Sequence, residues 1–217
     1  MSLAVRYGRD EVAALIPLAG MRVVQKNDVR FMARLQGKPE RDIQQRFAEG
    51  HRAYVAMVDG QPAGWGWVAT RSARIGELET SFDIPRGARY LWNFVTLPGH
   101  RGKGIYPRLL DAIVRTESGR AEQFWIAYAP ENCASAAGIY KAGFTKVATL
   151  SFSPAGTPAV IGVDYDGGVA AARLLGLPQS SGAISQCWRC ARTRTSDVKA
   201  CAATSCCCDY QNPEISC

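Results

Sequence analysis

The sequence predicts an α/β fold with a mixed sheet, and three features support this prediction. An apolar, aromatic run over residues 90–96 has the composition of a strand, and residues 106–116 follow it with an amphipathic helical pattern. A second pair of this kind occupies residues 124–128 and the segment from Asn132 onward. Upstream, residues 54–70 read as two strands joined by a tight turn. Strands and helices in this order are typical of α/β domains.

The first fifty residues predict mainly helices. Residues 10–19, 26–36 and 39–49 each look helical, and Pro39 suits the first turn of the last segment because a proline there loses no intrahelical hydrogen bond.

The expected hairpin consists of residues 54–58, a turn at 59–62, and residues 63–70. Trp65 and Trp67 alternate with glycines, so both side chains point to one face of the strand. We expect this face to be core, with the wall of an acceptor pocket as the alternative. Further strands are expected at residues 74–80, 123–128, 144–152 and 158–165, and a short apolar helix at 169–175.

The turn at residues 98–107 predicts a binding site for an anion. Its glycines allow a sharp bend and let backbone N–H groups approach phosphate oxygens closely. The unpaired N–H groups and the dipole of the helix that follows favour negative charge. Arg101 and Lys103 can add charge-assisted hydrogen bonds. Alone, Gly102-x-Gly104 could equally be an ordinary tight turn.

A second motif about thirty residues downstream strengthens the interpretation as a phosphate site. It opens with Asn132, a good helix N-cap, and ends with Gly143-Phe144. Together with the run from Arg101 to Gly104, this order and spacing resemble the GNAT family of acyl-CoA N-acyltransferases. The resemblance covers roughly residues 4–165, and its specific part is 90–144.

The resemblance implies a GNAT fold: a mixed, mostly antiparallel sheet with splayed central strands, flanked by helices. It implies that the strand before the turn offers its backbone to the pantetheine arm of acetyl-CoA, the co-substrate. The turn would hold the pyrophosphate, and the second motif would contact the arm. The residues expected to bind the cofactor are Phe94, Val95, Thr96, Arg101, Gly102, Lys103, Gly104, Ile105, Tyr106, Asn132 and Ser135.

The chain departs from the family pattern at three positions. Tyr106 stands where Gly or Ala is usual, and we expect its side chain to pack away from the phosphates instead of donating its hydroxyl to one. Ile139 stands where many members place the tyrosine that protonates the leaving thiolate. Its neighbour Tyr140 is the candidate acid, although one helical residue is about 100° of rotation.

The third departure concerns the general base. Asn93 stands where some members carry a glutamate, and an amide cannot act as a base. Asn93 could instead orient a water or the incoming amine. Glu79 is the candidate base in a nearby acidic segment, with Glu77 and Asp83 as alternatives, although solvated surface carboxylates are the ordinary reading of all three. The catalytic candidates are therefore Asn93, Tyr140 and Glu79.

From these residues we predict an acyl-CoA-dependent N-acyltransferase that moves an acetyl group to a primary amine on a small molecule. Alignment of the two substrates alone can supply much of the rate enhancement. The backbone N–H of Val95 or Thr96 could stabilise the oxyanion. Protein or peptide N-acetylation is the alternative within this class, and a non-catalytic acyl-CoA sensor is the alternative outside it.

Composition is consistent with this prediction. The net charge of +7 and the pI near 9.1 suit an anionic ligand such as CoA. The arginines are scattered and no nucleic-acid-binding motif is present, so no nucleic-acid partner is expected. No apolar run reaches the eighteen residues of a membrane span, and no secretory signal is visible, which predicts a cytoplasmic protein without a membrane partner.

The composition changes near residue 166, which suggests an acyltransferase domain over 1–166 and a cysteine-rich, flexible extension over 167–217. Seven of the eight cysteines lie from Cys187 to Cys217. Zinc on a thiolate site is one interpretation of Cys187-x-x-Cys190, and a reactive extension without metal is the other. A second pair at zinc-ribbon spacing is absent and His51 and His100 are the only histidines, so no metal site is assigned.

Overall fold

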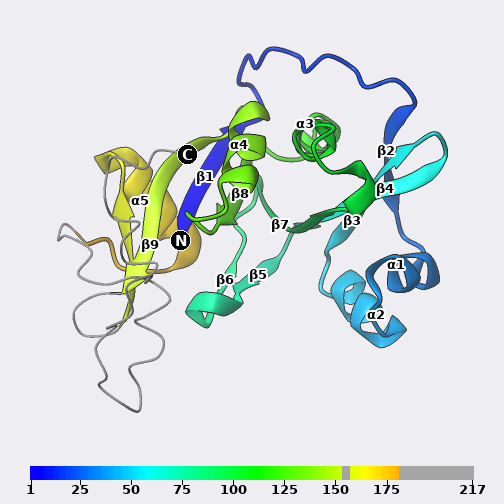
Figure 1. Cartoon of the computed structure of the whole chain (residues 1–217). Helices are drawn as coiled ribbons and strands as arrows, with labels where there is room; N and C mark the ends of the chain where they lie inside the picture. Colours follow the sequence, from blue (N-terminus) through cyan, green and yellow to red (C-terminus); the bar gives the residue numbers. More distant parts are fainter. Residues whose placement is uncertain (153–156, 181–217) are drawn as a thin grey trace, which may run out of the picture.

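The centre of the molecule is an eight-stranded sheet (Figure 1), which the computed structural model describes together with its helices over residues 1–152 and 157–180. The order of strands across the sheet is β10-β9-β1-β8-β7-β4-β3-β2. The strands are β1 (Ser2–Tyr7), β2 (Met21–Lys26), β3 (Arg52–Val58), β4 (Gln61–Ala69), β7 (Ala88–Thr96), β8 (Gln123–Tyr128), β9 (Thr145–Phe152) and β10 (Pro158–Gly162). A separate hairpin contains β5 (Ser72–Ile75), the 3₁₀ turn η1 (Gly76–Leu78) and β6 (Thr80–Asp83).

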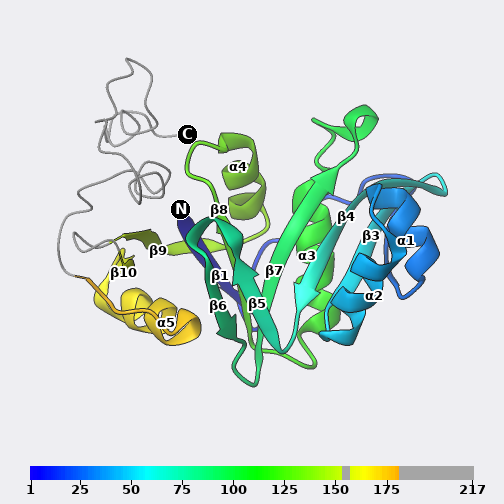
Figure 2. The same ribbon diagram turned by 90° about the horizontal axis from the view of Figure 1, so that it is seen from below.

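Two antiparallel halves of the sheet meet at one short parallel pair. The strands β2, β3, β4 and β7 form one half, and β8, β1, β9 and β10 form the other. β7 and β8 pair in parallel only as far as Leu91 and Ile126. Beyond these residues the two strands separate, as Figure 2 shows. The predicted mixed, mostly antiparallel sheet with splayed central strands is confirmed.

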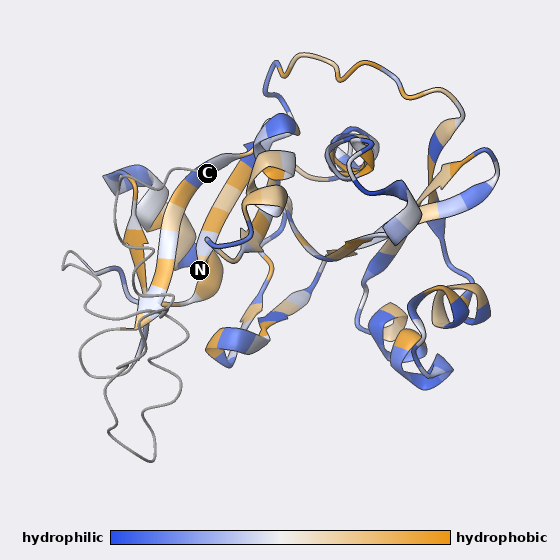
Figure 3. Cartoon of the chain, viewed as in Figure 1, coloured by the Kyte–Doolittle hydropathy of each residue, from blue (hydrophilic) through white to orange (hydrophobic). Residues whose placement is uncertain are grey.

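Helices cover both faces of the sheet. The helices are α1 (Val29–Gln36), α2 (Glu40–Ala48), α3 (Ile105–Glu117), α4 (Cys133–Lys141) and α5 (Tyr165–Leu175). α1 and α2 lie across one face of the β2–β4 half, and α3 lies on the opposite face (Figure 1). α5 packs against β6, β9 and β10. Apolar residues are concentrated along the central strands and the inner faces of the helices (Figure 3).

The two faces of β4 carry different side chains for a structural reason. Trp65 and Trp67 are buried beneath α1 and α2, which confirms their prediction as core. On the other face, a Cβ added to Gly64 would lie 2.6 Å from the Val95 carbonyl oxygen, and one added to Gly66 would overlap the Phe94 ring. The glycines of β4 therefore allow β7 to approach closely as it curves away from β8.

β7 curves because it carries a bulge. Its pairing with β4 shifts register between the partners of Trp65 and Trp67, and Asn93 within it has a φ of 51°. A bulge inserts one residue and bends its strand, and asparagine tolerates the left-handed conformation better than most residues. The bulge lies where β7 and β8 separate.

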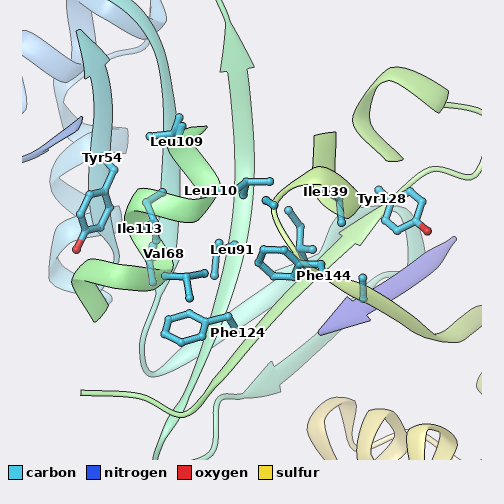
Figure 4. Close-up of a cluster of buried hydrophobic side chains, with 14 of the residues drawn as sticks. Tyr54, Val68, Leu91, Leu109, Leu110, Ile113, Phe124, Tyr128, Ile139 and Phe144 are labelled. Carbon is cyan, nitrogen blue, oxygen red and sulfur yellow. The ribbon is translucent and has the colours of Figure 1, made fainter. Parts of the chain in front are cut away.

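Apolar packing and buried charges fix the position of α3. Leu109, Leu110 and Ile113 of α3 pack toward Leu91 and Phe124 of the sheet (Figure 4).

At the C-terminal end of α3, Glu117 is 0% exposed and accepts hydrogen bonds from Arg52, Tyr54 and Arg89 at 2.6–3.1 Å. Burial alone would raise the pKa of the Glu117 carboxyl, but these donors outweigh burial and hold it below its usual value. Because Arg52 lies on β3 and Arg89 on β7, this carboxylate ties α3 to both strands.

Three expectations about secondary structure in the N-terminal half of the chain are corrected. Residues 10–19 form no helix and instead run as an extended strap between β1 and β2 (Figure 1), because Pro17 disfavours helix at the preceding residue and leaves too short a segment. Residues 26–36 begin as the end of β2 and turn helical at Val29, after the cap Asp28. The strand expected at 74–80 is the end of β5, the turn η1 and the start of β6.

At the C-terminal side, β10 ends at Gly162 instead of continuing to residue 165. The predicted division between residues 166 and 167 falls inside α5, where Leu174 and Leu175 are buried. The cysteine-rich segment from Cys187 onward, with its zinc alternative, lies outside the described residues.

Candidate active site

A cavity of about 1000 Å³ opens where β7 and β8 separate. It extends along the end of β7, across the N-terminus of α3, and along the exposed side of α4. Of the predicted cofactor residues, it is lined by Phe94, Val95, Thr96, Arg101, Gly102, Gly104, Ile105, Tyr106, Asn132 and Ser135. Lys103 is the exception, because its ammonium donates to the Gly99 carbonyl at 2.9 Å within the loop.

The N-terminus of α3 is built to receive an anion. Gly102 and Gly104 have φ values of 74° and 70°, which glycine adopts at little cost. No side chain in the described part of the chain caps this helix, so the first N–H groups remain available to a ligand. Arg101 donates from Nε to the Thr96 carbonyl at 3.2 Å, which fixes the loop against the end of β7. Uncapped donors, a helix dipole and exposed cations fit a pyrophosphate.

Along β7, backbone groups face the opening. The Leu97 N–H donates to the Ala63 carbonyl at 2.9 Å and so points toward β4. Because N–H groups alternate between the two edges of a strand, those of Phe94 and Thr96 point away from β4 toward the gap. Of the two expected oxyanion donors, the Thr96 N–H therefore points into the cavity, whereas the Val95 N–H points toward β4.

Asn132 uses its side chain to cap α4. Its Oδ1 accepts from the Ser135 N–H at 3.0 Å, which is the ordinary N-cap arrangement. Asn132 and Ser135 also line the cavity, so capping and a place in the cavity wall coexist at this position.

Tyr106 packs between β7 and α4, as expected. Its ring centroid lies 5.5 Å from that of Phe94, and its hydroxyl lies 3.4 Å from Ser135 Oγ. A Cβ added to Gly138 would overlap the Tyr106 ring. The glycine of α4 thus provides the space that the larger residue at position 106 requires. Burial raises the pKa of the Tyr106 hydroxyl to about 12, so it stays protonated.

The strap, the whole connection between β1 and β2 over residues 8–20, also contributes to this cavity, which the sequence did not indicate. Leu15 lines the wall, and the Ile16 carbonyl accepts from Arg108 Nε on α3 at 2.9 Å. Val12 packs where a Cβ on Gly143 would stand. A half-buried residue at every third position of the strap (Val12, Leu15 and Leu18) is a weak signal of such a packed, extended segment.

A second cavity of about 580 Å³ lies on the other side of the opening, beneath the β5–β6 hairpin. It is lined by Met1, Arg74, Ile75, Glu77, Tyr90, Trp92, Asn93, Ala127, Tyr128 and Ala129. Trp92, Asn93, Ala127, Tyr128 and Ala129 line both cavities. The two cavities therefore meet at the bulge of β7 and the end of β8.

The three catalytic candidates occupy different places. Asn93 lies at the junction of the two cavities with an exposed side chain. Tyr140 is 46% exposed and lines neither cavity, but its hydroxyl lies 2.5 Å from that of Tyr128. Glu79 is exposed and lies outside both linings, as does Asp83, whereas Glu77 belongs to the second cavity.

Tyr128 is a further candidate that the sequence analysis missed. As the last residue of an apolar strand it reads as core, and its ring does join the buried cluster beside Ile139 (Figure 4). Its hydroxyl, however, meets Tyr140 at the junction end of β8. Burial, then the hydrogen bond with Tyr140, raises the pKa of Tyr128, so this phenol holds its proton at neutral pH.

Trp92, at the junction, is held by residues beyond either cavity. Its Nε1 donates to His51 Nδ1 at 3.0 Å, and the Arg46 guanidinium lies 4.7 Å from its ring centroid. Burial lowers the pKa of the His51 imidazole, which keeps Nδ1 available as an acceptor.

Comparison with known proteins gives one family match. A family model described as acetyltransferase (GNAT) family matches residues 23–144. No curated protein sequence matches the chain.

No helix over residues 1–152 and 157–180 is long and apolar enough to cross a membrane. The same residues contain no group of three or more His, Cys, Asp or Glu side chains suited to a metal ion.

Among solved structures, the chain is similar to a GCN5-related N-acetyltransferase from Kribbella flavida, with 15% identity, a TM-score of 0.39, and coverage of 58% of this chain and 46% of that one. An acetyltransferase of the GNAT family from Colwellia psychrerythraea gives 18% identity and a TM-score of 0.41, and the match covers 67% of this chain and 52% of that one. An aminoglycoside N-acetyltransferase in complex with CoA gives 22% identity, a TM-score of 0.45, and coverage of 64% and 97%. The matched part thus spans about half of the length of the first two proteins.

Proposed function

The chain belongs to the acetyltransferase (GNAT) family, and from this we propose that it transfers an acetyl group from acetyl-CoA to a primary amine on a small molecule. The observation that carries the proposal is the separation of β7 and β8 beyond Leu91 and Ile126. It leaves strand backbone and a helix N-terminus unpaired within one cavity, with a second cavity meeting the first at Asn93.

In the proposed complex, the pyrophosphate of CoA lies on the N–H groups of the turn from Arg101 to Tyr106. The pantetheine arm runs along β7 toward the bulge and places the thioester at the junction of the cavities. The amine enters from the β5–β6 side and attacks the carbonyl carbon. The N–H groups of Phe94 and Thr96, which point into the gap, are the candidates to stabilise the oxyanion.

The proton for the departing thiolate comes, in this proposal, from the paired hydroxyls of Tyr128 and Tyr140. Tyr128 lines both cavities, and Tyr140 connects it to solvent. Because its pKa is raised, the Tyr128 phenol stays protonated at neutral pH, so a proton donor is present where the thiolate forms. Tyr140 thus acts through Tyr128. Ile139, at the position where many family members place the acid, is fully buried in this chain, and the proposal gives it no catalytic role.

A strong base is not required at the junction. An amine that arrives unprotonated needs only alignment for its attack, and alignment can lower a barrier by several kcal/mol, about 7–11 in favourable model reactions. Asn93 can orient the amine or a water from its exposed position on the bulge. Glu77 is the carboxylate of the acceptor cavity and a better placed proton acceptor than Glu79.

Calorimetric titration of acetyl-CoA and free CoA, under reducing conditions, tests the cofactor site. Saturable binding of both ligands is expected, and absence of binding would overturn the proposal. Product formation from a panel of amines, detected by mass spectrometry because eight cysteines would react with thiol dyes, tests the reaction. Tight binding without product from any amine would favour the sensor alternative, and products only with peptides would favour the peptide acetyltransferase.

A further inference from the structure

We propose that the acceptor is a small amine that also carries a carboxylate next to an apolar side chain, in the manner of an apolar amino acid. This inference rests on the proposed acetyl transfer and specifies the substrate of the second cavity. It depends on three properties of that cavity: an arginine side chain without a partner, a single carboxylate side chain, and aromatic walls whose rings are fixed by residues outside the cavity.

Arg74 supplies the site for the carboxylate. It lies on β5, its side chain is exposed, and it lines the second cavity. Its backbone pairs with β6, but within the described residues its guanidinium makes no hydrogen bond or ion pair, although Glu77 lines the same cavity. A guanidinium presents parallel N–H groups that match a carboxylate, so an arginine that faces a cavity without a partner is suited to bind one.

Glu77 supplies the attraction for the amine. It lies on η1, at the end of β5, and its negative charge contributes to the raised pKa of the buried Tyr90 hydroxyl, after burial itself. Glu77, Tyr90 and Asn93 line the same cavity. An ammonium group drawn in by Glu77 thus enters close to the junction where the thioester carbonyl would lie.

The charge balance of the cavity narrows the substrate class. One side-chain cation and one side-chain anion line it among the described residues, namely Arg74 and Glu77. A polyamine would leave Arg74 facing a like charge, and a strongly anionic amine would leave Glu77 facing one, each at a cost in affinity. A molecule with one amine and one carboxylate satisfies both groups.

Tyr90 and Trp92 form the apolar walls. The Tyr90 ring stands edge-on to Phe82 at 5.2 Å, and Trp92 is held by the hydrogen bond to His51. Rings that are fixed before binding lose little entropy when a ligand packs on them. Ile75 and Met1 extend the apolar surface, so an apolar side chain fits better than a polar one.

The reaction is balanced without a further reactant. The amine nitrogen forms a bond to the acetyl carbon as the bond from that carbon to the CoA sulfur breaks. One proton leaves the nitrogen and one proton reaches the sulfur, which gives an N-acetyl amino acid and free CoA.

Matched pairs of acceptors test this inference. Phenylalanine is compared with phenethylamine, and leucine with 3-methylbutylamine, since each pair differs only by the carboxylate. We expect kcat/KM to be higher for the amino acid by about 10–100-fold, as for a charged hydrogen-bonding group. Arg74→Ala should abolish this preference by raising KM for the amino acids, and Arg74→Lys should recover part of it.

Arg86→Ala is the matched control, because Arg86 is an exposed arginine that lines neither cavity. Equal use of both members of each pair, or an unchanged preference in Arg74→Ala, would overturn the inference and leave acetyl transfer intact. Absence of product from every amine, with acetyl-CoA still bound, would overturn the proposed function and the inference with it.

Discussion

The two cavities that meet at Asn93 are built in different ways. The proposed cofactor side comes largely from two stretches of chain, residues 91–108 and 126–141, and much of its lining is glycine, strand backbone or helix N-terminus. The proposed acceptor side is lined by Met1, β5, η1, β7 and the end of β8, and its character comes from side chains such as Arg74 and Trp92. Recognition by backbone requires a fixed local sequence, whereas recognition by side chains needs only that the fold bring them together.

The largest expected effect is confined to the cofactor side. Gly104→Asp places a carboxylate at the proposed pyrophosphate site, and like charges in close contact cost several kcal/mol, so the Kd for CoA should rise by about 100-fold or more. Calorimetry measures the change. Gly60→Asp is the control, because Gly60 also has a positive φ but lies in the β3–β4 turn. An equal loss in both variants would point to strain alone.

The next effect tests the junction of the two cavities. Tyr128→Phe should lower kcat by about 100-fold, in the range for removal of a general acid, and leave the Kd for CoA unchanged. Tyr140→Phe, which removes only the connection to solvent, should lower kcat about ten-fold. Steady-state kinetics measure both. An unaltered kcat in Tyr128→Phe would remove this pair of hydroxyls from the mechanism.

A smaller effect tests the fit between α3 and α4. Gly138→Ala forces its new Cβ against the Tyr106 ring and should cost about 1–3 kcal/mol of stability, because the site is already filled. In a Tyr106→Ala background, which vacates this space, Gly138→Ala should cost much less than it does beside the intact ring. Urea denaturation measures the free energies of unfolding. Gly119→Ala is the control, since a Cβ there meets nothing within 4 Å. An equal cost of Gly138→Ala with and without the Tyr106 ring would contradict the pairing.

The smallest effect concerns the support behind Trp92. Burial lowers the pKa of His51 in the folded state, so the unfolded chain binds a proton to this residue at higher pH than the folded chain does. The stability that the neutral imidazole contributes is fully present above about pH 6.5, the ordinary pKa of histidine. It declines as the pH falls from there through the lower pKa of His51 in the folded state. His51→Gln, which can still accept from Trp92, should flatten the profile of unfolding free energy between about pH 7 and 5.

That profile has a second component at lower pH. The pKa of Glu117 is held low in the folded state, so its contribution is present above the ordinary glutamate range, about pH 4.3, and is lost below it. A decline between about pH 7 and 5 that persists unchanged in His51→Gln would therefore exclude His51 as its cause.

Much of the cofactor side could be predicted from the sequence. Ten of the eleven cofactor residues line one cavity, because strand, turn and helix follow one another directly in the chain. Lys103 was included for its charge and its place in the motif, but its ammonium donates to the Gly99 carbonyl and its residue does not line the cavity. The strap around Leu15 was predicted as a helix, since an apolar segment with Pro17 can satisfy either pattern until its packing partners are known.

For the proposed acceptor cavity and the proposed proton donor, the sequence analysis selected fewer of the residues that the structure brings together. Glu79 was the candidate base, yet Glu77, two residues earlier, lines the cavity, because the turn η1 directs the two side chains differently. Tyr128 was hidden within an apolar strand. Tyr106 packs as expected, but the space for it comes from Gly138, thirty-two residues downstream.

The sequence by itself determined the family, the splayed mixed sheet and most of the residues that line the first cavity, because glycine positions, helix starts and strand composition act over neighbouring residues. The tertiary structure alone decided which tyrosine reaches the junction, which carboxylate lines the second cavity, and that Arg74 and Trp92 line it together. Those relations join residues far apart in the chain, and their distances depend on how the two halves of the sheet pack, which no local pattern encodes.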